Sequence, residues 1–162
     1  MAQVDYFLKV DGAEGESPDG KHKGEIEVVS FSWGVHQQGT SSHGGGAGAG
    51  KAAFSDFNFV KRYDKASPKV MEMCAGGNHI PKVTLVCRKA GKEQQEYLKI
   101  EFSDAFVSSY QIGGSGGHDI IPNDSISINF SKIQATYKEQ KSDGTLGGTT
   151  QGGWDLKANN KA

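Results

Sequence analysis

The sequence predicts a mainly β fold, in which two packed sheets form a β-barrel or sandwich with one short flanking helix. Roughly eight segments alternate apolar and polar residues with a period of two, which is typical of strands with one face in a core. Only the stretch from Ser67 to Gly76 has helical spacing instead. With 162 residues, of which 35% are hydrophobic, a single domain spanning residues 1–162 is expected.

Two strands are predicted in the N-terminal part, separated by a polar, turn-rich loop from Asp11 to Gly24. The first runs from Val4 to Val10. The second is expected to be continuous from Glu25 to Val35. Alternation places Val4, Tyr6, Leu8 and Val10 on one face of the first strand, and Val29, Phe31, Trp33 and Val35 on the apolar face of the second.

A long glycine-rich loop, Gln37 to Ala53, follows the second strand. Loops of this length are usually functional or disordered. Gly45, Gly50 and Lys51 have the spacing of a phosphate-binding loop, but Ala52 stands where that motif needs a hydroxyl. The segment after it alternates like a strand and offers no helix N-terminus to a phosphate. We therefore expect a flexible or assembly-ordered loop and no nucleotide site.

The helix follows a strand that begins at Phe57. Ser67 is the expected N-cap and Pro68 the first helical residue, because proline fits that position and disfavours helix before it. Gly76 and Gly77 supply the C-terminal stop. The expected apolar stripe of the helix consists of Val70, Met71 and Cys74.

The C-terminal half reads as further strands joined by turns. Val83 to Cys87 and Tyr97 to Phe102 form a predicted pair around a turn at Ala90–Lys92, and Phe106 to Ile112 is a separate strand. Alternation is most regular from Ser125 to Tyr137, with a bend expected after Phe130. Gly144–Gly153 is predicted to be a second glycine-rich loop, followed by a short strand at Trp154–Leu156.

Composition argues against several classes of function. The net charge is −1 with scattered basic residues, so neither nucleic-acid binding nor membrane insertion is expected. The N-terminus lacks a signal-peptide pattern. His22, His43 and His118 lie in or beside polar loops and are expected to be solvated. No histidine pair has metal-ligand spacing, so we predict no catalytic, metal or cofactor site.

The polar faces of the predicted strands are unusual because they lack charge. Exposed strands tend to carry lysine and glutamate, which oppose edge-to-edge pairing. A face of small hydroxyl groups could be buried against a partner, or it could line the water-filled interior of a ring. In a ring each charge is repeated in every subunit, so an uncharged lining avoids a strong electrostatic potential of one sign. It could also be an ordinary exposed face. The residues concerned are Ser30, Ser32, Ser125, Ser127, Asn129 and Ser131.

An ordered set of motifs resembles the haemolysin-coregulated protein (Hcp) family, the tube subunit of the bacterial type VI secretion system. The set spans essentially the whole chain. It comprises D-Y-F-L-K-V at Asp5, G-E-S at Gly15, S-F-S-W-G at Ser30, the glycine loop ending in G-K, F-x-F-x-K-x-x-D-K-x-S-P at Phe57, M-x-x-C at Met71, R-K-A-G at Arg88, E-Y-L at Glu96, V-S-S at Val107, G-G-S-G-G at Gly113 and G-W at Gly153.

The resemblance implies homohexameric rings that stack into a hollow tube, tipped by a spike protein and propelled by a contractile sheath. It also implies small effector proteins held in the lumen, assembly in the bacterial cytoplasm, export without a signal peptide, and no catalysis. If the roles of the family are assigned to this sequence, Ser32 and Ser30 are the expected contacts with the lumen and the cargo, and Phe31 and Trp33 are expected to point into the core. The expected inter-subunit or inter-ring loop contains Gly44, Gly45, Gly46, Gly48, Gly50 and Lys51.

Two alternatives remain open from the residues. One is a monomeric β-sandwich that binds a ligand through its serine faces or loops. The other is a hydrolase centred on Cys87, which requires a reactive thiol. Cys74 and Cys87 otherwise read as small buried apolar residues.

Overall fold

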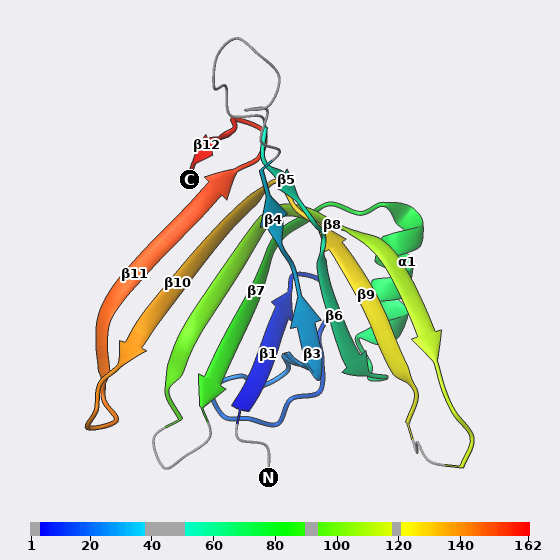
Figure 1. The fold of residues 1–162 in the computed structure, drawn as a ribbon. Coiled ribbons are helices and arrows are strands. Elements are labelled where there is room, and N and C mark those ends of the chain that lie inside the picture. Colours follow the sequence, from blue (N-terminus) through cyan, green and yellow to red (C-terminus); the bar gives the residue numbers. More distant parts are fainter. Residues whose placement is uncertain (1–3, 38–50, 90–93, 118–120) are drawn as a thin grey trace.

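The computed structural model describes residues 4–37, 51–89, 94–117 and 121–162, and these residues form one helix and two main sheets (Figure 1). The predicted turn at Ala90–Lys92 lies outside the described residues. The elements are β1 (Val4–Val10), β2 (Ile26–Glu27), β3 (Ser30–Ser32), β4 (Val35–His36), β5 (Ala53–Phe54), β6 (Phe57–Arg62), α1 (Ser67–Gly76), β7 (Ile80–Lys89), β8 (Glu96–Gly113), β9 (Asn123–Asn129), β10 (Lys132–Gln140), β11 (Leu146–Asp155) and β12 (Asn160–Lys161).

The strands are arranged as a sandwich rather than a closed barrel, which confirms the predicted class in its sandwich form. The first sheet has the order β12-β11-β10-β8-β7-β1-β2, and the second has the order β3-β6-β9-β8. The long strand β8 belongs to both sheets. A separate two-stranded ribbon, β4–β5, extends at the end of the molecule near the C-terminus (Figure 1).

Apolar side chains between the two sheets form one core. Phe57 and Phe59 from β6, Phe102 from β8 and Phe130 are all 3% exposed or less. The rings of Phe57 and Phe102 lie 4.6 Å apart, and those of Phe102 and Phe130 lie 4.8 Å apart. These contacts join the second sheet to the first through apolar burial, the main favourable term in folding.

The predicted continuous strand from Glu25 to Val35 is wrong, because the chain changes sheets within it. The Val28 amide donates to the Tyr6 carbonyl of β1, whereas the next amide, Val29, donates to the Val60 carbonyl of β6. This switch reverses the alternation. Val28 is therefore buried, Val29 is 56% exposed, and Phe31 packs against the core.

Strand β8 corrects a second prediction, since Tyr97–Phe102 and Phe106–Ile112 are parts of one strand. Asp104 has a positive φ of 49° at the point where the strand bends from one sheet into the other. Residues up to Ala105 pair with β7 or β10, and those from Phe106 onward pair with β9. A bend that retains hydrogen bonding on both sides leaves no turn signal in the sequence.

The segment Gly144–Gly153 was predicted to be a loop, yet most of it lies in β11. Strand β11 pairs with β10 from Lys132↔Asp155 to Gln140↔Leu146. Trp154 belongs to this strand, and Leu156 follows it. Pairing with a long neighbour has overridden the low strand propensity of glycine. The predicted bend after Phe130 is confirmed, because β9 ends at Asn129 and β10 begins at Lys132.

α1 lies in the predicted stretch from Ser67 to Gly76, and its C-cap is Gly77 with a φ of 62°. The predicted N-cap is wrong: Ala66 occupies that position without a side-chain cap, and Ser67 is the first helical residue. Met71 is also 50% exposed instead of buried, whereas Val70 is 1% exposed and Met73 packs against the core.

Candidate functional site

The outer face of the second sheet carries small, uncharged polar side chains in register across four strands. One row joins Ser32, Asn58, Ser127 and Ser109, and the next joins Ser30, Val60, Ser125 and Gln111. We call this surface the serine face, and define it as Ser30, Ser32, Asn58, Ser109, Gln111, Ser125, Ser127 and Asn129.

Alternation explains why these residues share one face. In β6 the even-numbered side chains point outward, and Phe57 and Phe59 point into the core. In β9 the odd-numbered side chains point outward, and Ile126 and Ile128 point into the core. Ser30 and Ser32 are exposed and flank Phe31, which packs inward, and Trp33 also packs against the core. Ser131 was predicted on this face but lies beyond β9, where its hydroxyl donates to the Asp104 carbonyl.

In the described part of the chain, charged side chains lie only at the two ends of this face. Asp56 precedes β6, and its carboxylate accepts hydrogen bonds from Ser108 Oγ at 2.6 Å and Asn129 Nδ2 at 2.9 Å. Arg62 ends β6 and is exposed. The rows between them are uncharged, so a repeated copy of this face would generate little single-sign potential.

Both edges of the second sheet are open among the described strands. β3 pairs only with β6, and the Phe106–Gly113 part of β8 pairs only with β9. Phe106 and Ile112 on that second edge are 42% and 52% exposed. An open edge presents unpaired backbone donors and acceptors to another chain.

A buried cluster fastens α1 to the second sheet beneath this face. Lys61 is fully buried, and its ammonium lies 2.7 Å from Asp124 Oδ2 and 2.8 Å from Asp64 Oδ1. Ser67 Oγ bonds to Lys61 and Asp124, which explains why this serine does not cap the helix. Burial, with the Asp124 carboxylate nearby, raises the pKa of Tyr110 to about 12.

The polar loop between β1 and β2 covers the outer face of the first sheet at β1 and β7. Arg88 is 2% exposed, and its guanidinium donates to Asp19 at 3.0 and 2.7 Å and to Asp5 at 3.1 Å. This pairing holds the pKa of Asp19 well below its usual range. The guanidinium also lies 4.7 Å from the ring centroid of Phe7.

His22, predicted to be solvated, is buried in the same region. It is 6% exposed, with Nδ1 2.7 Å from Glu25 and Nε2 2.7 Å from Glu96, and its ring stacks on Phe7 at 4.4 Å. Its partner Glu96 is 74 residues away in the chain, so spacing could not reveal the contact. We call Arg88, Asp19, Asp5, His22, Glu25, Glu96 and Phe7 the Arg88 cluster.

Cys87 lacks the properties of a nucleophile. It is 1% exposed, and burial raises its pKa to about 11, so little thiolate forms at neutral pH. Cys74 is half-buried and packs against the core. Within the described ranges, no group of three or more histidine, cysteine or acidic residues is placed to hold a metal ion. The same residues contain no helix that is long and apolar enough to cross a membrane.

The glycine loop can be described only at its base. Gly44, Gly45, Gly46, Gly48, Gly50 and His43 lie outside the described residues, as does His118. Lys51 is exposed and leads into β5, so a strand and not a helix follows the G-K dipeptide. This agrees with the expected absence of a helix N-terminus for a phosphate.

Comparison with known proteins relates the whole chain to one family. The family model described as "Type VI secretion system effector, Hcp" matches residues 7–137. "Protein hcp1" of Pseudomonas aeruginosa is 43% identical over 161 residues, which cover 98% of this chain and 99% of that protein.

Solved structures agree over the same length. The crystal structure of Hcp1 from Salmonella typhimurium has a TM-score of 0.85 at 39% identity and covers 99% of this chain and 100% of that one. A type six secretion system protein has a TM-score of 0.92 at 31% identity, covering 98% and 99%. A type VI secretion system effector from Yersinia pestis has a TM-score of 0.74 at 35% identity, covering 93% and 99%.

Proposed function

This chain belongs to the Hcp family of type VI secretion proteins, and from that membership we propose that it is the structural subunit of a secretion tube. Six copies would form a ring, and rings would stack into a hollow tube that carries a spike protein at its tip and is propelled by a contracting sheath. The subunit would be made in the cytoplasm, would be exported without a signal peptide, and would perform no catalysis.

The open edges of the second sheet support ring formation. In a ring, the β3 edge of one subunit would lie beside the Phe106–Gly113 edge of the next. The two edges are different surfaces, and such a heterologous contact closes into a ring when the rotation between subunits permits. Burial of Phe106 and Ile112 would favour the contact.

The serine face supports the lumen assignment and is the observation that carries the proposal. Small hydroxyl and amide groups would leave the lumen wet and nearly neutral, even with six copies of every side chain. Small effector proteins would be held there by many weak polar contacts, with Ser32 and Ser30 among the first of them. The glycine loop, including Gly44–Gly50 and Lys51, would contact a neighbouring subunit or ring.

Light scattering and negative-stain imaging of the purified protein test this proposal directly. The expected result is a mass of six subunits and open rings. A single monomer peak across a wide concentration range would reject the tube subunit and favour a monomeric β-sandwich that binds a ligand.

A substitution at Ser32 tests the lumen role separately. Ser32→Gln adds bulk on an exposed position, so rings should form while co-purification of a co-expressed effector falls. Ser142→Gln, in the exposed turn between β10 and β11, is the matched control and should change neither. Loss of rings in Ser32→Gln alone would instead identify Ser32 as an interface residue.

A further inference from the structure

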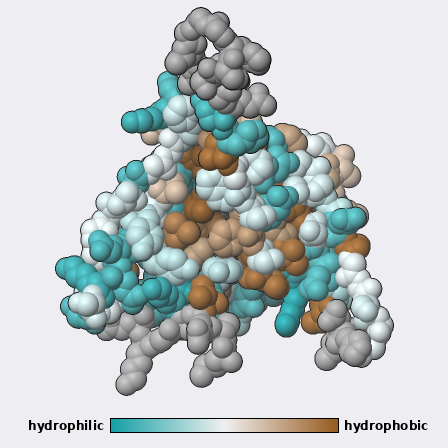
Figure 2. All heavy atoms as spheres, viewed as in Figure 1, coloured by the Kyte–Doolittle hydropathy of each residue, from teal (hydrophilic) through white to brown (hydrophobic). Residues whose placement is uncertain are grey.

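Lys61 and Asp124 are fully buried charged residues that face each other across neighbouring strands. They are register partners in the antiparallel pairing of β6 with β9, and both side chains are 0% exposed. Charged side chains normally lie at the surface, and Figure 2 shows hydrophilic side chains spread around the rim of the molecule. Lys61 Nζ lies 2.7 Å from Asp124 Oδ2. An amine and a carboxyl group are therefore held in contact in a site closed to solvent.

The inward faces of the two strands make the surroundings of this pair apolar. The neighbouring inward pair consists of Phe59 and Ile126, each 1% exposed. The first turn of α1 adjoins the pair, because Ser67 bonds to both Lys61 and Asp124. In such surroundings two opposite charges are costly, and transfer of a proton from an ammonium to a carboxylate leaves neutral groups that burial disfavours less. A neutral, desolvated lysine amine is a nucleophile.

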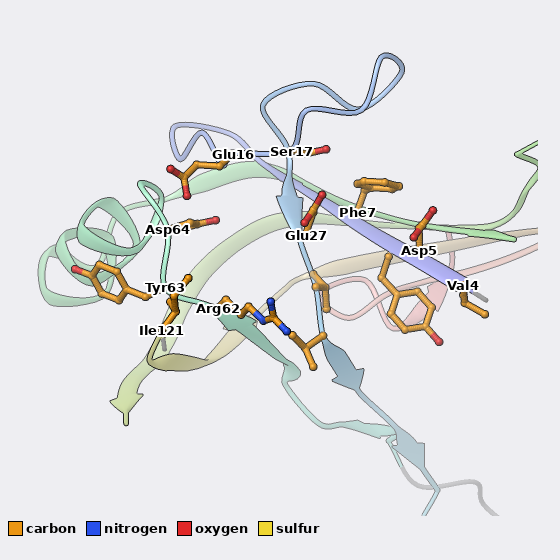
Figure 3. Close-up of a pocket in the computed structure, with 13 residues that line it drawn as sticks. Val4, Asp5, Phe7, Glu16, Ser17, Glu27, Arg62, Tyr63, Asp64 and Ile121 are labelled. Carbon is orange, nitrogen blue, oxygen red and sulfur yellow. The ribbon is translucent and has the colours of Figure 1, made fainter. Parts of the chain in front are cut away.

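A second carboxylate contacts the same amine. Asp64 Oδ1 lies 2.8 Å from Lys61 Nζ, which is within the range for direct proton transfer. Asp64 is on the turn between β6 and α1 and lines a groove of about 460 Å³ (Figure 3). Its side chain is 11% exposed, so it connects the buried pair with solvent. Asp64 is thus placed to accept protons from the amine and to release them again.

The two oxygens of Asp124 have different surroundings. Oδ2 contacts Lys61 Nζ and Ser67 Oγ. Tyr110 lies near the same carboxylate, yet Oδ1 is buried and no described residue donates a hydrogen bond to it. A buried carboxylate oxygen without a donor is costly, and a neutral amide oxygen is less so. The donors gather instead at Oδ2, the oxygen that a condensation with the amine would remove.

We propose that Lys61 and Asp124 join in an intramolecular amide bond (an isopeptide bond), which the folded chain forms without an added enzyme. The bond links β6 to β9 through their side chains. It depends on the geometry within one subunit, so it is independent of the proposed tube. It is a single reaction of the chain with itself and needs no substrate site.

The reaction balances without any other reactant. Asp64 accepts a proton from the Lys61 ammonium, and the neutral Nζ attacks Cγ of Asp124, which is held next to it. The bond from Nζ to Cγ forms and the bond from Cγ to Oδ2 breaks. Nζ gives up two protons in all, which Asp64 passes to Oδ2, so that Oδ2 leaves as water. The ammonium and the carboxylate become a neutral amide, and Asp64 regains its initial state.

Intact mass spectrometry of the full chain tests the bond. The native protein is purified, kept at neutral pH and then unfolded for the measurement. The expected mass is lower than the sequence mass by one water molecule. Because trypsin does not cleave after an acylated lysine, digestion should leave residues 52–62 joined to residues 100–132. Lys61→Met should have its full mass. Lys99→Met, which removes an exposed lysine paired with Glu101, is the matched control and should keep the loss of water.

Two outcomes of this experiment overturn the proposal. The full sequence mass in the native protein would show that the two side chains stay an ion pair. A loss of water that persists in Lys61→Met, or that maps to other peptides, would place the dehydration elsewhere, such as a succinimide at Asp143 before Gly144. Neither outcome bears on the number of subunits, which light scattering measures separately.

Replacement of Asp64 tests its part in the proton transfers. Asp64→Asn keeps the size of the side chain but removes the proton acceptor, so the linked fraction after a fixed incubation should fall at least several-fold. Glu72→Gln, which changes an exposed acid paired with Lys69, is the control and should form the bond as the wild type does. An unchanged linked fraction in Asp64→Asn that elutes as a folded protein would contradict the role of Asp64. The wild-type mass decides the bond itself, whether or not this variant folds.

Discussion

The two sheets of this sandwich have outer faces of opposite chemistry. Over β1 and β7 the outer face of the first sheet is covered by the loop between β1 and β2, and the charges there are paired around the buried Arg88. No described residue covers the serine face of the second sheet, and its central rows carry no charge. Both faces lie on the same core, so packing inside the sandwich does not account for the difference.

The contrast separates side chains that hold the fold from side chains available to partners. Arg88 and His22 are buried and each bond to two carboxylates, and removing either would leave partly buried carboxylates without partners. Ser30, Ser32 and Ser125 are exposed and can change with little effect on folding. A surface freed from a role in stability can be adapted to its contacts, which supports the lumen assignment.

Replacement of Arg88 is expected to change the free energy of unfolding the most. Arg88→Met should lower the free energy of unfolding by about 3–5 kcal/mol, because Asp19 and Asp5 would lose a buried cation. Urea denaturation at fixed protein concentration measures the change. Lys69→Met, which removes an exposed pair with Glu72, should cost less than about 1 kcal/mol. Equal losses of stability in the two variants would show that the Arg88 pairing contributes no more than an exposed ion pair.

The second-largest effect on stability is expected at a glycine in the loop between β1 and β2. A Cβ at Gly15 would lie 2.5 Å from the Glu25 carbonyl oxygen, whereas one at Gly20 would have no heavy atom within 4 Å. Gly15→Ala should therefore cost about 1–3 kcal/mol through displacement of the backbone. Gly20→Ala should be neutral or slightly stabilising. Thermal unfolding of the two variants compares them, and a neutral Gly15→Ala would show that the loop is loosely held.

Acid should weaken the ion pair between Asp19 and Arg88 on the outer face of the first sheet before it affects the serine face. The guanidinium of Arg88 lowers the pKa of Asp19 in the folded state. The Asp19 carboxylate therefore stabilises the fold fully above its unfolded pKa, which is near 4, and this stabilisation is lost as the pH falls toward the lower folded pKa. The stability difference between wild type and Asp19→Asn should be constant from about pH 7 to 5 and shrink below about pH 4. Urea unfolding across this range would refute the assignment if the difference stayed constant.

The smallest expected effect on stability is a charge placed on the serine face. Ser125→Lys adds a solvated cation to an exposed position, so the free energy of unfolding should change by less than about 0.5 kcal/mol. In the proposed six-subunit ring, this change would place a ring of positive charge in the lumen. Retention of a co-expressed effector should therefore change while the urea midpoint does not. A large loss of stability would show that this face is part of the folded core.

Local sequence determined much of this protein. Alternation predicted the inner and outer faces of β1, β6, β7 and β9, and the Ser67–Gly77 segment predicted the only helix of the described chain. The ordered motifs indicated the family. These features depend on residues that are close in the chain, where a period of two or a terminal glycine has a direct structural meaning.

Tertiary structure alone decided the remaining features. The change of sheet at Val28 and Val29, the bend of β8 at Asp104 and the pairing of glycine-rich β11 all depend on which strands become neighbours. The burial of His22 likewise requires Glu96, far along the chain. Such contacts leave no periodic signal, because each is fixed by a partner whose position is known only once the sheets have assembled.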